Sequence, residues 1–179
     1  MKQNSILIVG IIGALIGTRF ADIDSALPFL THRSIITHGV IFPLMIWFIA
    51  IKYSNTGWRL FAIGFSMAMA VHLCFDLYPR GWAGFALIHV PGIGRLSKEL
   101  SWSWIACNII VTQFLALWLA WKMRDIILAI VSAGIPFFVH GQKEAFSSPL
   151  LTFGVILAAT FWLSEQETWV KKKIRTTNE

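Results

Sequence analysis

The stretch "WRLFAIGFSMAMAVHLCFDLY", residues 58–78, is almost wholly apolar and has the length of a membrane-crossing helix. About 20 residues at 1.5 Å each cross the roughly 30 Å hydrocarbon core of a bilayer. Five other windows share this character, at residues 4–21, 36–52, 103–121, 126–140 and 149–164. The window at 126–140 is short and contains Pro136, so it predicts a partial or tilted span. We therefore predict an all-α fold, a polytopic transmembrane helical bundle of about six spans.

The composition of the 179-residue chain also indicates a membrane protein. It is 56% hydrophobic and 13% charged, with a mean hydropathy of +0.68, whereas soluble domains carry about 25% charged residues. Lys2 precedes the first window as in a signal peptide, but no small-residue cleavage site follows, so we interpret this window as a retained span. Cys74 and Cys107 fall inside predicted spans, which favours apolar packing over a disulfide. We predict one integral membrane domain, residues 1–179.

The orientation is predicted from lysine and arginine, which accumulate on the cytoplasmic side of short loops. If the first span starts inside, the inner side holds nine of these residues, and the outer side holds six: Arg19, Arg33, Arg80, Arg95, Lys98 and Lys143. Both termini then face the cytosol, and residues 165–179, with "VKKKIR", form a basic tail at an anionic leaflet. This tail accounts for the formal net charge of +6, so the expected partner is the lipid bilayer and no nucleic acid is required.

The ionisable residues near the spans gather on the outer half in this topology. They are His32, His38, His72, His89 and His140, together with Asp22, Asp24 and Asp76. Ionisable groups near the hydrocarbon are costly and normally face a protein interior or a water-filled cavity. Their gathering on one side predicts a functional site there.

The negative charges of the aspartates must be compensated, and this requirement limits the kinds of site that these residues can form. His72 and Asp76 are four residues apart, so on a helix they share one face, a spacing that suits two ligands of one metal ion. Asp76 and the pair Asp22 and Asp24 each follow or end a span, at a helix C-terminus where the negative dipole disfavours a carboxylate. A positive charge must compensate them.

Two sources of that charge are open. One is ion pairing with Arg19, Arg33 or Arg80, with the histidines bonded to loop carbonyls. The other is a divalent metal ion, since neutral imidazole and carboxylate together suit zinc, manganese or iron. The whole constellation favours the metal.

The order of these motifs resembles a known family. "DID" at 22–24, "HR" at 32–33, "TH" at 37–38 and "HLCFD" at 72–76, followed by a glycine, are similar to the pattern of the YdjM-like family of bacterial inner-membrane proteins, described as membrane-bound metal-dependent hydrolases. The resemblance covers roughly residues 1 to 120 and departs from the pattern at Ala21, Ser34 and Gly39. It implies a multi-pass protein of the bacterial inner membrane whose Asp and His residues hold a metal for hydrolysis.

Roles for individual residues follow from these motifs. The expected metal ligands are Asp22, Asp24, His32, His38, His72 and Asp76, for one ion or two, most simply zinc. If Asp24 is not a ligand, it is the candidate general base. Arg33, assisted by Arg80, is the candidate to clamp an anionic substrate oxygen, and neutralising the nearby aspartates is the alternative role. A site at this level would act on an ester or phosphoester of an amphiphilic or lipid-linked substrate.

The longest connection, residues 79–102, is rich in glycine and aromatic residues and predicts a lid or interfacial loop. Its His89, like His140, we place outside the site. Trp82, Trp102 and Trp104 are typical of interfacial anchors, although they could also guide an amphiphilic substrate.

Two other functions use the same residue types. A metal-ion or proton transporter also needs intramembrane His and Asp, but it requires polar groups near the midplane, and the inner halves of the first three spans are almost wholly apolar. A non-catalytic membrane subunit in which a metal only fixes the helices is the third possibility. The depth of the polar residues favours the enzyme.

The predicted topology can be tested by labelling. A cysteine placed in the 82–98 loop is expected to react with a membrane-impermeant reagent added to intact cells, and one placed near Lys172 is expected not to react, because the charge asymmetry puts the tail inside. The opposite labelling pattern would move the site to the cytosolic face.

Overall fold

A computed structural model describes residues 3–142 and 145–177, with side chains described for 7–142 and 145–162. Within these residues the chain forms six α-helices: α1 (Gln3–Phe20), α2 (Ile41–Tyr53), α3 (Thr56–Asp76), α4 (Lys98–Leu119), α5 (Met123–Gly141) and α6 (Ser147–Thr177). Two short 3-10 helices, η1 (Ala21–Ala26) and η2 (Gly84–Ala86), and one antiparallel hairpin of β1 (His89–Val90) and β2 (Gly94–Arg95) complete the fold. The predicted all-α fold is confirmed.

Three of the described helices, α3, α4 and α5, are long and apolar enough to cross a membrane. The apolar helix α2 and the apolar part of α6, Ser147–Trp162, are shorter. Helix α5 is longer than the predicted window 126–140, and Pro136 lies inside it without ending it. The side chains of the predicted basic tail, residues 165–179, lie outside the described residues.

Two helix starts differ from the predicted windows for local reasons. Helix α2 begins at Ile41 rather than at residue 36, because the N–H groups of Thr37 and His38 both bond to the carbonyl of Ser34 and close a turn first. Helix α4 begins at Lys98 rather than at residue 103, because the Ser97 hydroxyl caps it by accepting from the N–H of Leu100. His38 therefore lies in a loop and not on a helix.

Helix α3 is the central helix of the bundle. Every residue from Ala62 to Phe75 is buried, and the helix packs against α1, α2, α4, α5 and α6. A helix that is apolar on all sides is expected to be enclosed by other helices in this way. Most of the 58–78 stretch is thus enclosed by the rest of the protein.

Glycines let α1 approach α3 closely. A Cβ atom on Gly64 would overlap the carbonyl oxygen of Gly10, and one on Gly13 or Gly17 would overlap the carbonyl oxygen of Phe61 or Phe65. Small residues at helix contacts are the usual means of close packing in membranes. The close contact fixes the end of α1 against the end of α3.

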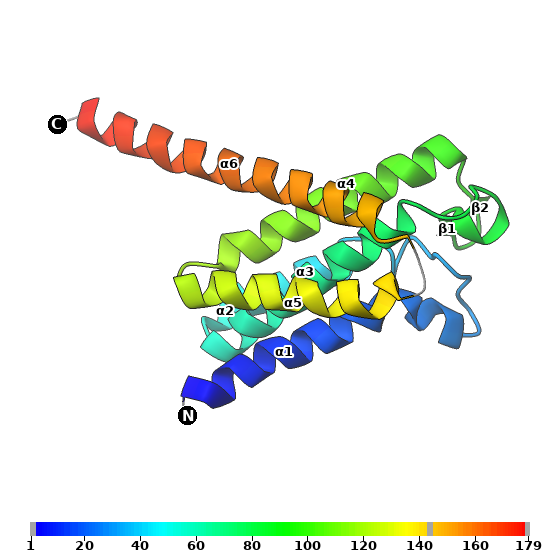
Figure 1. The fold of residues 1–179 in the computed structure, drawn as a ribbon, viewed down its shortest axis with the longest axis horizontal. Coiled ribbons are helices and arrows are strands. Elements are labelled where there is room, and N and C mark those ends of the chain that lie inside the picture. Colours follow the sequence, from blue (N-terminus) through cyan, green and yellow to red (C-terminus); the bar gives the residue numbers. More distant parts are fainter. Residues whose placement is uncertain (1–2, 143–144, 178–179) are drawn as a thin grey trace.

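Successive helices alternate in direction, as Figure 1 shows. The C-terminal ends of α1, α3 and α5 meet at the end of the bundle that carries the β1–β2 hairpin. This arrangement gathers η1, the loop of residues 27–40 and the last turn of α3 in one region, although they are far apart in the sequence.

The predicted interfacial loop, residues 79–102, is fastened to the loop of residues 27–40. The N–H of Ile35 donates to the carbonyl of His89, and the N–H of His89 donates to the carbonyl of Arg33, each at 2.9 Å. Ile88 is fully buried beneath this contact. The two loops therefore form a joint cover on the end of the bundle.

The opposite end of the bundle contains a buried ion pair. Nη1 of Arg59 lies 2.6 Å from Oδ2 of Asp125 and also donates to the carbonyl of Leu119 at 2.8 Å. Asp125 is fully buried, so its charge depends on this partner. The contact joins the first turns of α3 and α5 to the end of α4.

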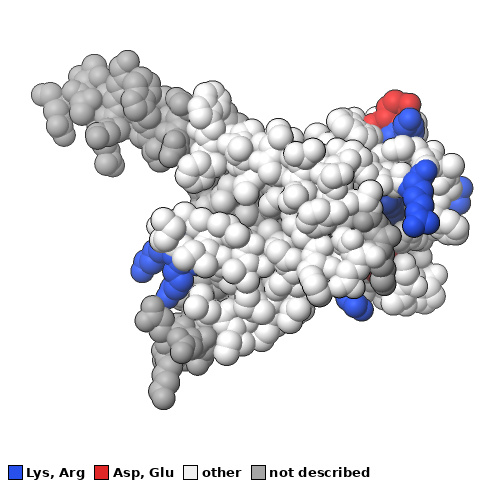
Figure 2. Space-filling view, viewed as in Figure 1, with Lys and Arg blue, Asp and Glu red and all other residues white. Residues whose placement is uncertain are grey.

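The surface is that of a membrane protein. Large apolar side chains are exposed along the outer helices, among them Leu15, Phe48, Phe138, Leu151 and Val155. Figure 2 shows a broad band without charge along the middle of the bundle, with the coloured Lys, Arg, Asp and Glu side chains mainly toward its two ends. Soluble monomers rarely expose apolar patches of this size.

The glycine contact between α1 and α3 gives a stability prediction. Gly64→Ala is expected to destabilise the protein by about 1–3 kcal/mol, because the added methyl group meets backbone that cannot move aside without separating the helices. Gly134→Ala in α5 is the matched control, since a Cβ there meets nothing within 4 Å. Thermal unfolding in detergent measures both. Equal melting temperatures for the two variants would contradict the close contact.

Candidate metal centre

Four side chains from three segments converge at the hairpin end of the bundle. Asp22 comes from η1, directly after α1, His38 comes from the turn before α2, and His72 and Asp76 come from the last turns of α3. Oδ2 of Asp76 lies 3.3 Å from Nε2 of His38 and 3.3 Å from Nε2 of His72. Oδ1 of Asp22 lies 3.6 Å from Nε2 of His72. The expected one-face pairing of His72 with Asp76 is therefore present.

The ligand atoms of Asp22, His38 and His72 all lie within 4.8 Å of one another, so this group could hold a metal ion. Both histidines are buried, whereas the side chain of Asp22 is 47% exposed. Among the described residues, Nε2 of His38 and Oδ2 of Asp76 are buried without a hydrogen-bond partner, although they face each other. Such buried, unbonded donor and acceptor atoms require an additional partner.

In each histidine, the Nδ1 atom makes a contact that fixes the orientation of the ring. Nδ1 of His72 lies 3.0 Å from the carbonyl oxygen of Thr18, which can only accept, so Nδ1 carries the proton. Nδ1 of His38 lies 3.2 Å from Oδ2 of Asp24 and donates to that carboxylate. When neutral, both rings therefore direct the lone pair of Nε2 toward the common point. This is the arrangement of histidines that bind metals.

Asp24 is a hub for the loop that carries His38. Its carboxylate is fully buried and accepts from the N–H of Ser34 and the hydroxyl of Thr37, each at 2.9 Å. Burial raises the pKa of Asp24, but the contact with His32 and the hydrogen bonds from His38 and Ser34 outweigh it and hold this pKa well below its usual range. Asp24 thus stays ionised and orients His38, and it is not part of the group formed by Asp22, His38 and His72.

Nearby carboxylates also change the pKa of His38. Burial of its ring lowers the pKa, but the charges of Asp76 and Asp24, together with the hydrogen bond to Asp24, outweigh burial and raise the pKa of His38 to about 9. The site therefore strongly favours a positive charge between these groups.

Arg33 supplies part of that positive charge. Its Nη2 donates to Oδ1 of Asp76 at 2.8 Å and its Nη1 donates to the carbonyl of Ala86 at 2.7 Å. The residue is 7% exposed and has a left-handed backbone with φ of 58°, a costly conformation that the surrounding bonds must hold. The expected neutralising role of Arg33 is thus visible, and both terminal nitrogens of the guanidinium are committed to it.

The formal charges of the ionised side chains show that the site lacks positive charge. Asp22, Asp24 and Asp76 contribute three negative charges and Arg33 one positive charge, so the site carries a net charge of −2 when both histidines are neutral. One divalent cation or two protonated histidines would neutralise it. The geometry fits the cation, because the ligand atoms of Asp22, His38 and His72 lie within 4.8 Å of one another and Oδ2 of Asp76 lies 3.3 Å from both Nε2 atoms.

Two further predicted site residues, His32 and Arg80, lie outside the point where the other side chains converge. His32 is 35% exposed, and its Nδ1 lies 3.6 Å from Oδ1 of Asp24, away from the convergence point. Arg80 is exposed and lines a separate opening of 440 Å³ together with His32 and Arg33. The structure therefore brings Asp22, His38, His72 and Asp76 together and leaves His32 and Arg80 outside them.

The structure adds residues that the sequence motifs do not indicate. Nε1 of Trp104 donates to the carbonyl of His38 at 3.0 Å, and Oδ1 of Asn108 accepts from the N–H of Val40 at 2.6 Å, so α4 holds the His38 turn. The ring of His140, expected outside the site, packs edge-on against His72 with centroids 4.8 Å apart. The position of His140 at the end of α5 is a signal that could have placed it beside the ends of α1 and α3.

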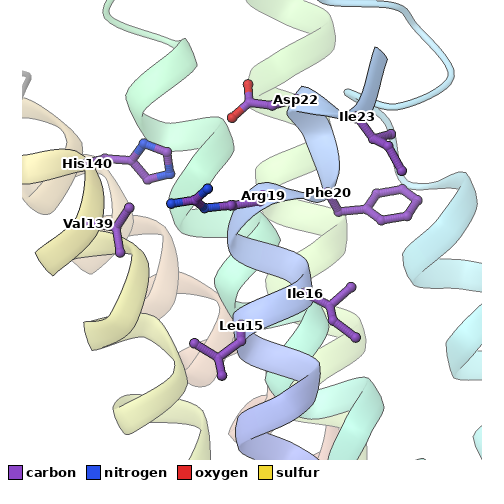
Figure 3. Close-up of a pocket in the computed structure, with 8 residues that line it drawn as sticks. All are labelled: Leu15, Ile16, Arg19, Phe20, Asp22, Ile23, Val139 and His140. Carbon is purple, nitrogen blue, oxygen red and sulfur yellow. The ribbon is translucent and has the colours of Figure 1, made fainter. Parts of the chain in front are cut away.

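A pocket of 690 Å³ opens beside the centre, between α1 and α5. Figure 3 shows Asp22 and His140 at one end of it and Leu15 and Ile16 further along α1, with the Arg19 side chain extending toward His140. The pocket gives the exposed carboxylate of Asp22 access to a small molecule or a lipid.

Searches of protein-family models, curated proteins and solved structures found no match to this chain.

Proposed function

We propose that this protein is a membrane-embedded, metal-dependent hydrolase that acts on an ester or phosphoester of an amphiphilic or lipid-linked substrate. The reaction takes place at the membrane–water interface on the outer face of the membrane. The observation that carries the proposal is the convergence of His38 Nε2, His72 Nε2 and the carboxylates of Asp22 and Asp76. The resemblance of these motifs to the YdjM-like family is consistent with it.

The ligand set fits one divalent ion, with zinc as the first choice. Two imidazole nitrogens and one carboxylate oxygen make the three-ligand set of many hydrolytic zinc enzymes, in which a further position stays open. Oδ2 of Asp76 is close enough to add a fourth ligand. Manganese or iron would accept the same atoms.

The chemistry is the addition of water to an ester. The oxygen of water bonds to the acyl carbon or phosphorus, the bond to the leaving oxygen breaks, and one proton of the water ends on that oxygen while the other is released. A divalent ion bound here would supply Lewis-acid chemistry that makes this attack feasible near neutral pH. Asp22 marks the side from which substrate enters, because it is the exposed member of the group.

Two other residues act as positioning residues in this proposal. Asp24 holds His38 in the tautomer whose Nε2 is free, which replaces the general-base role considered from the sequence. Arg33 bonds to Oδ1 of Asp76 and leaves Oδ2 facing the histidines. Arg80 stays a candidate for substrate contact at the second opening.

The surroundings of the candidate metal centre favour an enzyme over a transporter or a non-catalytic membrane subunit. Between Arg59 and His72, helix α3 has no ionisable residue, so no chain of titratable groups leads inward along it. A purely structural metal site would be closed, whereas Asp22 is exposed and borders a pocket.

Metal analysis of the purified protein is the direct test. The wild type is expected to hold about one ion per chain, and His72→Ala and Asp76→Asn are each expected to lose most of it, because each removes one ligand atom. The double variant is expected to lose little more than either single one, since neighbouring residues that act as a unit are not additive. His89→Ala is the control, because its ring lies outside the group.

Ion pairing without metal gives the opposite result. The wild type would then contain no stoichiometric metal by elemental analysis, and a chelator would leave its melting temperature unchanged. That result would remove the hydrolase proposal and leave a structural cluster of charges.

The orienting role of Asp24 gives a separate prediction. Asp24→Asn is expected to weaken metal binding by about 10- to 100-fold while a full complement still binds at saturation, because the change affects an orienting group and not a ligand. A competitive chelator titration measures this affinity. Ser25→Ala is the control, since its hydroxyl lies 3.4 Å from Asp24 and 3.3 Å from Nδ1 of His32 and contacts none of the converging ligand atoms. An unchanged affinity would refute the orienting role, and a lost binding site would make Asp24 a ligand.

A further inference from the structure

Resting on the proposed function, we propose that the pocket between α1 and α5 binds a phosphate-bearing lipid, with Arg19 contacting the phosphate and the apolar wall of the pocket contacting the hydrocarbon chain. The proposed ligand is therefore an amphiphile with an anionic phosphate group and a hydrocarbon chain.

The pocket has one polar end and one apolar wall. Arg19, Asp22 and His140 line the polar end, and Leu15, Ile16 and Val139 line the apolar wall. Leu15 is 55% exposed and Ile16 is 45% exposed, so this wall is open along the outside of the bundle, where lipid chains lie. A molecule that satisfies both parts has a charged head and an apolar chain.

Arg19 is the available cation near the centre. Arg33 is committed to Asp76 and Ala86, whereas no hydrogen bond or ion pair of Arg19 occurs within the described residues. Its guanidinium extends into the space between α1 and α5, on the same side as His140 (Figure 3). A guanidinium fork matches the oxygens of a phosphate group.

The other opening fits such a lipid poorly. It measures 440 Å³ and is lined by Arg80 and by short residues such as Gly81, Ala83 and Gly84, with Phe85 as its one large apolar side chain. It offers a cation but no aliphatic wall. Of these two openings beside the candidate metal centre, the pocket between α1 and α5 is therefore the one that accommodates the chain of an amphiphile.

The pocket also delivers its occupant to the metal centre. Asp22 belongs both to the lining of the pocket and to the candidate metal group, and His140 lines the pocket while packing on His72. The carboxylate of Asp22 repels a phosphate when it is uncompensated. A divalent ion on Asp22 is therefore expected to strengthen phosphate binding as well as to promote hydrolysis.

Native mass spectrometry of the full chain in neutral detergent tests the proposal with dodecylphosphonate, whose carbon–phosphorus bond is not hydrolysed. The wild type is expected to bind one molecule of it more tightly than dodecanol or inorganic phosphate. Arg19→Gln is expected to weaken dodecylphosphonate binding by at least about tenfold and to leave dodecanol binding unchanged, because only a charged hydrogen bond is lost. Arg95→Gln, an exposed arginine on β2, is the control.

A matched pair of substitutions on α1 tests the apolar wall. Ile16 and Ile12 are both 45% exposed and lie one turn apart, but only Ile16 lines the pocket. Ile16→Trp is expected to fill the pocket and reduce dodecylphosphonate binding at least tenfold, and Ile12→Trp is expected to bind as the wild type does. Melting temperatures confirm that all variants are folded.

The outcomes separate this inference from the proposed function. Metal content is measured on the same samples, and its absence in the wild type defeats the metal-dependent hydrolase. The comparison of the variants with the wild type then still tests the lipid site, because all samples lack metal alike. Dodecylphosphonate binding that is insensitive to both Arg19→Gln and Ile16→Trp overturns the lipid site, whether or not metal is present. Equal affinity for inorganic phosphate would also overturn it, because the occupant would then be a free anion.

Discussion

The close contact of α1 with α3 is the constraint on which the centre depends. Because Gly13, Gly17 and Gly64 allow the backbones to meet, the carbonyl of Thr18 comes within 3.0 Å of Nδ1 of His72. That bond sets the tautomer of His72 and turns Nε2 toward Asp22, which follows α1 by two residues. A wider separation of the two helices would leave the same residues in the sequence but would not produce a common point.

The second requirement is that a turn outside the helices be held rigidly. His38 lies on a loop, and loops at the edge of a membrane are usually mobile. Here Asp24 binds the turn from η1, and Trp104 and Asn108 bind it from α4. The backbone bonds to His89 add the support of the hairpin. The polar groups that fix His38 are therefore buried neighbours, and each finds its partner within the protein.

The sequence predicts the helices well because length and hydropathy alone determine which segments can enter a bilayer. It also places His72 and Asp76 on one face, because a spacing of four residues has the same consequence in any helix. It cannot distinguish Asp22 from Asp24, since the path of η1 decides which of the two faces inward to the His38 turn and which faces the pocket. Likewise the contacts of Arg33 with Ala86 and of His140 with His72 depend on tertiary packing between distant segments, which no local spacing reveals.

The buried pair of Arg59 and Asp125 at the far end of the bundle has a consequence for biogenesis. The two residues belong to α3 and α5, which are separated in the chain by the whole of α4. During synthesis α3 reaches the bilayer first, and an unpaired arginine stays hydrated rather than entering the protein interior. The pair can therefore close only after the start of α5 arrives, which makes the locking of this end a late event in membrane insertion. The four side chains that converge at the hairpin end all belong to the first 76 residues, so they are synthesised before Asp125, which closes the pair at the opposite end.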